Sequence, residues 1–246
     1  MHYDLQPLFL TFKLALVVTA ILFVLGVPLA CWIAFSNNRS KYIVEALVSM
    51  PLVLPPTVIG FYMLVAFSPQ YFLGHFLESF FGLRVVFSFT GLVIGSVLFS
   101  LPFMVNPIKA GLENFPRGLM EASFCLGKSR RETLWRVILP NIKPALLTGV
   151  VMAFAHTIGE FGVVLMIGGN IPQETRLASI AIYNEVEALN YDTAGLYALI
   201  LVGISFLMLL IFYYLNRKPG TLFSLGFDRS NPYVMIPAMS WPQMLR

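Results

Sequence analysis

The sequence predicts an all-α membrane protein, a polytopic helical bundle with about five to six transmembrane helices. Three observations support this prediction. Hydrophobic residues make up 58% of the 246 residues and charged residues only 11%, whereas soluble domains carry roughly 45–50% apolar and about 25% charged residues. Long uncharged runs alternate with short polar segments, and the basic residues gather in every second polar segment. This composition excludes a cytosolic enzyme, a disordered chain and a disulfide scaffold.

Five apolar runs are long enough to cross a membrane as helices, which takes about 20 residues each. Four runs hold no charged residue, and the remaining one holds a single acid, Glu160. The runs cover residues 14–35, 46–67, 85–106, 144–167 and 195–215. We expect the first run to stay in the membrane, because it is longer than the apolar core of a signal peptide and no small-residue cleavage site follows it.

Lysine and arginine residues set the expected orientation, since short cytoplasmic loops carry an excess of them. Thirteen of the 16 basic residues fall on one side, and only Lys13, Arg84 and Arg176 fall on the other. This predicts a multi-pass protein of the plasma (inner) membrane with its N-terminus outside and its C-terminus in the cytoplasm. Residues 1–218 form the transmembrane domain, and residues 219–246, which include four prolines, form an irregular cytoplasmic tail.

The external segment 68–84 carries large apolar residues at helical spacing. Such spacing places them on one face of a helix. The segment is therefore either an interfacial helix lying on the membrane or a loop that packs on the bundle. The residues of this face are Leu73, Phe76, Leu77, Phe80 and Phe81.

The longest cytoplasmic segment, residues 107–143, carries seven basic residues. Residues 118–127 favour a first short helix, and residues 131–139 favour a second one that Pro140 ends. An ordered basic platform suits a protein partner, but contact with anionic lipid head groups is an equal alternative on composition.

The same segment contains a near-match to a phosphate-binding loop, A-S-F-C-L-G-K-S over residues 122–129. Ala122 replaces the first glycine of that motif, and no strand precedes it. We therefore expect no nucleotide site in this chain, so an ATP-driven process would need a separate ATPase subunit.

A second pattern in this segment resembles the E-A-A-x3-G-x9-I-x-L-P signature of ATP-binding-cassette importer permeases. Ser123 stands for the second alanine and Val137 for the isoleucine. In that family the segment forms the coupling helix, which docks in a groove of the ATPase, and Gly127 would permit the sharp turn. The residues that carry the resemblance and the expected coupling role are Glu121, Ala122, Ser123, Gly127, Leu139 and Pro140.

Two further stretches resemble molybdate-type permeases, which are relatives of the sulfate permeases. They read S-M-P-L-V-L-P-P-T-V-I-G over residues 49–60 and I-G-E-F-G-V-V-L-M-I-G-G-N-I-P-Q-E-T-R over residues 158–176. The resemblance implies a type I importer permease for molybdate, with tungstate as a further candidate, acting by alternating access. It also implies a homodimer, two ATPase subunits that bind ATP and magnesium, and an extracytoplasmic oxyanion-binding protein. A sulfate or thiosulfate permease and a stand-alone secondary transporter remain alternatives.

Prolines interrupt the second run near its cytoplasmic end. A proline removes a backbone donor and bends a membrane helix. The break is either a kink without a role or an unwound segment that lines the transport pathway. The candidate pathway residues here are Pro51, Pro55, Pro56 and Thr57.

The fourth run holds Glu160, the one acid well inside a span. A charge at this depth costs about 2.5–3.5 kcal/mol on insertion scales, so it rarely faces lipid. His156 lies one helical turn earlier and could pair with it, and Gly159 and Gly162 would allow close helix packing. These four residues form either a gate or dimer-contact element, or Glu160 is a packed, hydrogen-bonded structural acid. A carboxylate repels a dianion, so Glu160 is not expected to be a substrate ligand.

The segment after the fourth run is the expected contact for a binding protein. Arg176 could attract an oxyanion or pair with that protein, or it could be a simple rim charge. The external segments are rich in acids, so the substrate rests on the resemblance alone. Membrane lipid is an expected partner, nucleic acid is not, and no metal-ligand spacing occurs. The candidate contact residues are Asn170, Pro172, Glu174, Thr175 and Arg176.

Overall fold

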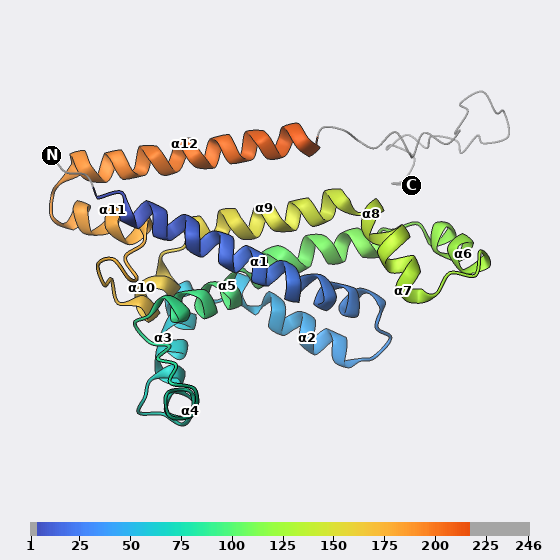
Figure 1. Ribbon diagram of the computed structural model, residues 1–246, viewed down its shortest axis with the longest axis horizontal. Coiled ribbons are helices and arrows are strands. Elements are labelled where there is room, and N and C mark those ends of the chain that lie inside the picture. Colours follow the sequence, from blue (N-terminus) through green and yellow to red (C-terminus); the bar gives the residue numbers. More distant parts are fainter. Residues whose placement is uncertain (1–3, 217–246) are drawn as a thin grey trace, which may run out of the picture.

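Three long helices form the centre of the fold. The computed structural model describes residues 4–216, and no strand occurs within them. The central helices are α1 (Gln6–Phe35), α5 (Phe89–Glu113) and α9 (Lys143–Gly159), and each packs on the other two. They run side by side along the long axis of the molecule (Figure 1). The all-α bundle that the sequence predicts is thereby confirmed.

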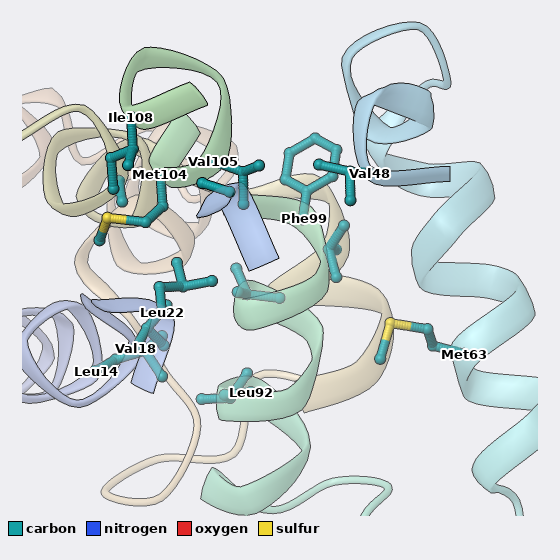
Figure 2. Close-up of a cluster of buried hydrophobic side chains, with 14 of the residues drawn as sticks. Leu14, Val18, Leu22, Val48, Met63, Leu92, Phe99, Met104, Val105 and Ile108 are labelled. Atoms are coloured by element: carbon teal, nitrogen blue, oxygen red, sulfur yellow. The ribbon is translucent and has the colours of Figure 1, made fainter. Parts of the chain in front are cut away.

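The core between these helices is apolar and tightly packed. Leu14, Leu22, Leu92 and Met104 are fully buried, and Figure 2 shows them converging from α1 and α5. Small residues let the backbones approach, since a Cβ atom added to Gly26 would lie 2.9 Å from Cγ of Met104. Close packing of this kind holds membrane helices together where lipid gives no hydrophobic drive.

The second apolar run is not one helix. It divides into α2 (Ser40–Ser49), a 3-10 turn (Met50–Leu52) and α3 (Pro56–Phe67), and the chain bends by 110° between them. The interruption that the sequence predicts at the prolines is therefore confirmed. Pro55 adopts an extended conformation and Pro56 begins α3, in keeping with the preference of a residue before proline for extended backbone.

Helix α4 (Phe72–Phe81) follows α3, and both project sideways from the bundle (Figure 1). Helical structure over the predicted apolar face is thus confirmed, and the loop alternative is wrong. Phe80 and Phe81 of this face are 75% and 64% exposed, whereas Leu77 packs on the core, so the face is only partly covered by the described chain. Its position on a membrane surface stays a prediction.

The fourth apolar run is also divided. Helix α9 ends at Gly159, and a short helix, α10 (Gly162–Gly168), follows after two non-helical residues. The prediction of one helix over residues 144–167 is wrong, and Glu160 lies in the break rather than inside a helix.

Two helices complete the described chain. Helix α11 (Ala178–Glu187) packs on α12 (Tyr191–Asn216) at one end of the bundle. Helix α12 runs along the outside of the bundle (Figure 1), and little of it is buried. Helices α1, α5 and α12 are long and apolar enough to cross a membrane, and two bent helix pairs raise the number of possible spans to five. The predicted tail over residues 219–246 lies outside the described residues.

The opposite end of the bundle carries the connection between α5 and α9. It consists of α6 (Arg117–Cys125), α7 (Arg130–Thr133), a π-helical segment (Leu134–Ile138) and α8 (Leu139–Asn141). The two short helical segments that the sequence predicts are confirmed, but the second runs through Pro140 to Asn141, so the prediction that Pro140 ends it is wrong. Residues 107–113 belong to α5, so the platform is shorter than the predicted 107–143 segment. We call residues 114–142 the platform.

Candidate functional site

A buried hydroxyl pair holds the two halves of the platform together. Ser123 Oγ of α6 lies 2.9 Å from Thr133 Oγ1 of α7. Both side chains are buried, at 5% and 1% exposure. A satisfied pair of buried polar groups fixes the geometry of its surroundings, so α6 and α7 form one unit.

A left-handed glycine makes the turn between these halves. Gly127 has φ +76°, a conformation that glycine adopts without steric cost. The Gly127 amide donates to the Phe124 carbonyl at 2.9 Å, and the Lys128 amide donates to the Ser123 carbonyl at 3.2 Å. These bonds end α6 by the usual glycine cap. The expected sharp turn at Gly127 is confirmed.

A small charge network stabilises the start of the second half. Glu132 accepts from Lys128 Nζ at 2.6 Å and lies 3.0 Å from an Arg136 nitrogen. Its amide donates to Ser129 Oγ at 3.2 Å, which caps α7. The hydrogen bond from Lys128 holds the pKa of the Glu132 carboxyl below its ordinary value, because it favours the charged form.

The outer surface of the platform mixes exposed apolar groups with basic ones. Glu121 and Ala122 are exposed on α6, and Leu126 and Trp135 are 80% and 69% exposed. Leu139 is half-buried against the core, and Pro140 is exposed at the base. These residues make the outer surface of the platform a candidate interaction surface.

The proline break of the second run lies against the break of the fourth run. A Cβ atom added to Gly162 would lie 2.6 Å from Cβ of Pro56. One turn further along α3, a Cβ atom on Gly60 would lie 2.7 Å from Cβ of Met166. The two glycines therefore allow α3 and α10 to touch, which confirms the packing role expected of Gly162. Pro55 and Thr57 are exposed beside this contact and Pro51 is half-buried.

Glu160 joins three elements at the break of the fourth run. Its Oε1 accepts from the Val163 amide at 3.1 Å, which caps α10. Its backbone carbonyl accepts from Ser179 Oγ of α11 at 2.7 Å. Glu160 is 4% exposed, so the acid is a buried junction between α9, α10 and α11.

His156 does not pair with Glu160. Its Nδ1 lies 3.0 Å from Ser100 Oγ, and its ring stacks on Phe103 with a centroid separation of 3.9 Å. Gly159 is exposed, and a Cβ atom there would meet nothing within 4 Å in the described part of the chain. The His–Glu pair that helical spacing allows therefore does not form, and the packing role of Gly159 stays a prediction.

The loop over residues 170–176 is built around a buried threonine. Thr175 Oγ1 donates to the Gly168 carbonyl at 2.6 Å and accepts from the Ile171 amide at 2.8 Å. Arg176 Nε donates to Asn170 Oδ1 at 3.0 Å. Thr175 is fully buried, so it shapes the loop and presents nothing to a partner, which corrects that part of the prediction. Pro172 and Glu174 are exposed.

A groove of about 680 Å³ opens beside this loop. Its polar lining includes Tyr71, Arg84, Ser88 and Glu174, and its walls are otherwise mostly apolar. Arg84 lies 3.7 Å from Glu78 of α4 and is largely exposed. The groove therefore joins the loop to the end of α3 and to the segment before α5.

Comparison with known proteins places the chain in a family. Residues 26–220 match the family described as "Binding-protein-dependent transport system inner membrane component". The chain belongs to this family. Membership makes it a multi-pass inner-membrane transport component, and the apolar lengths of its helices agree with that.

Several permease sequences of this family are similar over most of their length. The chain is 43% identical over 217 residues to the molybdenum transport system permease protein ModB of Azotobacter vinelandii, covering 88% of this chain and 96% of that protein. It is 34% identical to the putative molybdenum transport system permease protein YvgM of Bacillus subtilis, covering 82% and 89%. It is also 34% identical to a probable sulfate transport system permease protein of Chlorokybus atmophyticus, covering 81% and 69%.

Solved structures agree in fold. The methionine ABC transporter MetNI in an inward-facing conformation contains a chain that matches with a TM-score of 0.70 at 17% identity, covering 87% of this chain and 95% of that one. A bacterial ABC transporter for the import of alginate matches with a TM-score of 0.68 at 15% identity, covering 86% and 79%. The fold is that of type I ABC importer permeases.

Some residues of this permease form structural contacts that the sequence did not indicate. Ser100, Thr133 and Ser179 form hydrogen bonds between different helices or to the break at Glu160, and small hydroxyl residues give no sequence signal of that. Arg84, which lines the groove, could have been singled out from the sequence, because it is one of only three basic residues on the predicted external side. Within residues 4–216 no group of three His, Cys, Asp or Glu side chains could hold a metal ion.

Proposed function

We propose that the chain is the membrane permease subunit of an ATP-driven importer for molybdate, with tungstate as a second candidate. The observation that carries the substrate is the 43% identity to a molybdenum transport permease over nearly the full length of both chains. A sulfate permease is the alternative, since sulfate transport permeases are also similar.

We infer that the platform couples the permease to an ATPase partner. Its exposed Leu126 and Trp135 could be covered by a protein partner. Glu121 and Gly127 match the family signature at this place, and the Ser123–Thr133 pair makes the platform rigid enough to transmit a movement. The partner, not this chain, would bind ATP and magnesium.

We also infer that two copies form the pathway by two-fold symmetry, with the platform in the cytoplasm and the loop over residues 170–176 outside. The pathway would pass the α3–α10 contact, where Pro55 and Thr57 are exposed. An extracytoplasmic oxyanion-binding protein would dock over the loop and the groove, near Arg84 and Arg176. In alternating access, the short helices α3 and α10 would move against each other.

Reconstitution tests the substrate. The chain is placed in liposomes with its ATPase and binding protein, and ATP hydrolysis and uptake are measured with molybdate, tungstate or sulfate. We expect molybdate to stimulate both at lower concentrations than sulfate does. If sulfate stimulates transport and molybdate does not, the chain belongs to a sulfate transporter. If the purified chain hydrolyses ATP without its partner, the proposal that the partner binds ATP is wrong.

The exposed Cys125 tests the orientation. In a Cys31→Ser background, an impermeant maleimide should leave Cys125 unlabelled in cells whose inner membrane is intact, and it should label Cys125 in inside-out vesicles that lack the ATPase. Labelling from the outside would reverse the topology.

A further inference from the structure

A cavity of about 450 Å³ lies between the platform and the end of α1. The last residue of α1, one side of α6 and the start of the second half of the platform line it. Figure 1 shows the platform at the same end of the bundle as the last turn of α1. Cavities of this size hold small organic ligands. We call this space the platform cavity.

The polar lining of the platform cavity carries positive charge without an acid to balance it. Arg130 and Arg131 line it, and no acidic residue of the described chain does. Within residues 4–216, neither arginine pairs with a carboxylate, whereas Lys128 and Arg136 of the same platform lie 2.6 Å and 3.0 Å from Glu132. Guanidinium groups bind phosphate oxygens in pairs, so the cavity suits a phosphate-bearing anion.

The rest of the lining is mostly apolar and incompletely covered. Phe35 of α1, Met120 and Phe124 of α6, and Leu134 face the cavity. Phe35 and Phe124 remain 44% and 43% exposed. A free inorganic anion has no apolar part to cover these rings. The ligand that fits both kinds of lining is therefore amphipathic, with an anionic head and an apolar body.

The platform cavity lies at the level where α1 leaves the membrane. The uncharged run over residues 14–35 spans roughly 33 Å as a helix, which is close to the roughly 30 Å of a hydrocarbon core. Phe35 ends this run and α1 together. Trp32, one turn earlier, is 42% exposed, as is typical of aromatic residues at a membrane surface. The lipid head groups are therefore the nearest source of such a ligand.

The platform cavity is separate from the surface that we assign to the ATPase partner. Met120 and Phe124 lie one turn apart and share a face of α6, whereas Ala122 lies on the opposite face. Ala122 is exposed and belongs to the family signature. A ligand in the cavity therefore leaves that side of α6 free.

We propose that the platform cavity binds an anionic phospholipid. The lipid phosphate lies on Arg130 and Arg131, and the first part of its acyl chains covers Phe35 and Phe124. Basic pockets beside spanning helices on the cytoplasmic side suit the head groups of anionic lipids. The choice of the inner leaflet rests on the orientation proposed above, whereas the site is independent of the transported anion. The bound lipid would connect the end of α1 to the platform.

A lipid titration of the purified full-length permease in detergent tests the site. Dioleoyl-phosphatidylglycerol is the anionic probe and dioleoyl-phosphatidylcholine the neutral one, and native mass spectrometry measures the bound lipid. Each basic residue at an anionic membrane surface raises affinity by a factor of about five. We therefore expect the R130Q/R131Q variant to bind phosphatidylglycerol about 30-fold more weakly than the wild type, with little change for phosphatidylcholine. Equal binding of phosphatidylglycerol by both proteins would overturn the proposal.

Arg117→Gln is the matched control for this loss of charge. Arg117 is an exposed platform arginine that pairs with no carboxylate within residues 4–216 and does not line the cavity. At about 0.15 M salt, charges outside the site are largely screened, so this variant should bind phosphatidylglycerol as the wild type does. Equal weakening by Arg117→Gln and by R130Q/R131Q would reduce the effect to overall charge and overturn the site.

Two soluble competitors separate a lipid from a free anion. They are inorganic phosphate and glycerophosphoglycerol, the head group without acyl chains. The head group should compete at least about tenfold more weakly than the whole lipid, the effect of leaving about two CH₂ groups uncovered. Displacement of the lipid by inorganic phosphate at equal concentration would assign the cavity to a free anion.

The same titration on the permease bound to its ATPase separates a lipid from a protein occupant. We expect unchanged affinity for phosphatidylglycerol, because Ala122 faces away from the cavity. Loss of the bound lipid on ATPase binding would make the cavity part of that protein contact and overturn the proposal. None of these measurements depends on transport, so their failure would leave the proposed substrate unaffected.

Discussion

The Ser123 hydroxyl lies 2.9 Å from the Thr133 hydroxyl and joins α6 to the last residue of α7. The signature of the importer permeases has alanine where this chain has Ser123. Ser123 is small, as the alanine of the signature is, and in addition it forms a hydrogen bond across the platform. This buried bond links α6 to α7, and the chain continues from α7 through the π-helical segment and α8 to α9.

Loss of this bond should weaken the platform. Ser123→Ala leaves the buried Thr133 hydroxyl without a partner, which costs about 1–3 kcal/mol of stability. Thr133→Val should cost a similar amount, whereas the double variant should be no worse than either single one, because no unpaired group remains. Thermal melting of the purified protein measures this, with the exposed Ser79→Ala as a neutral control. Losses that simply add would show that the two hydroxyls act separately.

The turn at Gly127 gives a sharper test of coupling. Gly127→Ala places a side chain at φ +76°, which costs roughly 1–2 kcal/mol through the backbone alone. A Cβ atom there would meet no other atom within 4 Å, so any effect comes from the turn itself. We expect reduced co-purification with the ATPase and reduced uptake.

Gly118→Ala is the matched control for this change. Gly118 lies on α6, the helix that the Gly127 turn ends, has ordinary helical backbone, and has equally open space for a Cβ atom within the described chain. It should leave assembly and uptake unchanged. If both alanine variants lose the ATPase equally, the left-handed turn is not the cause.

The apolar runs were sufficient to predict the bundle but not its two broken spans. Pro51, Pro55 and Pro56 indicate an interruption, but a proline fixes only local backbone, and the 110° bend depends on where α3 packs. The break at Glu160 follows from the contact between Gly162 and Pro56, two residues more than 100 positions apart. Spacing along one helix suggested that His156 would meet Glu160, and that holds only if the helix continues to residue 160.

The platform was easier to predict because its signals are local. Gly127 permits a left-handed turn directly after a short predicted helix, and the charges around Glu132 follow helical spacing. Thr175 shows the opposite case. Its place in a polar loop suggests exposure, but its hydroxyl is used inside the loop by Gly168 and Ile171.

The contact between α3 and α10 should not tolerate a side chain at Gly162. In Gly162→Ala the new Cβ atom would lie 2.6 Å from the rigid ring of Pro56, so the two short helices must separate. Overpacking of this kind costs typically about 1–3 kcal/mol, and we expect both a lower melting temperature and a loss of uptake. Gly159→Ala, which has open space within the chain, should keep its melting temperature in the monomer. If Gly162→Ala behaves like Gly159→Ala, the close packing is not required.

The pH dependence of stability should report the charge network at Glu132. Its carboxyl has a pKa below the ordinary value of 4.5, chiefly because Lys128 donates a hydrogen bond to it. A depressed pKa in the folded state means that the carboxyl stabilises the fold fully above the pKa of the unfolded chain, and that this contribution is lost as the pH falls through the folded-state value. Melting temperatures of the wild type and of Glu132→Gln should therefore differ at pH 7 and converge toward pH 3.

Two further variants are the controls for this prediction. Lys128→Met should reduce the difference between wild type and Glu132→Gln, because it removes the main cause of the pKa shift. Arg117→Met, which pairs with no carboxylate within residues 4–216, should keep it. A difference between wild type and Glu132→Gln that is the same at both pH values would mean that Glu132 acts through packing and not through its charge.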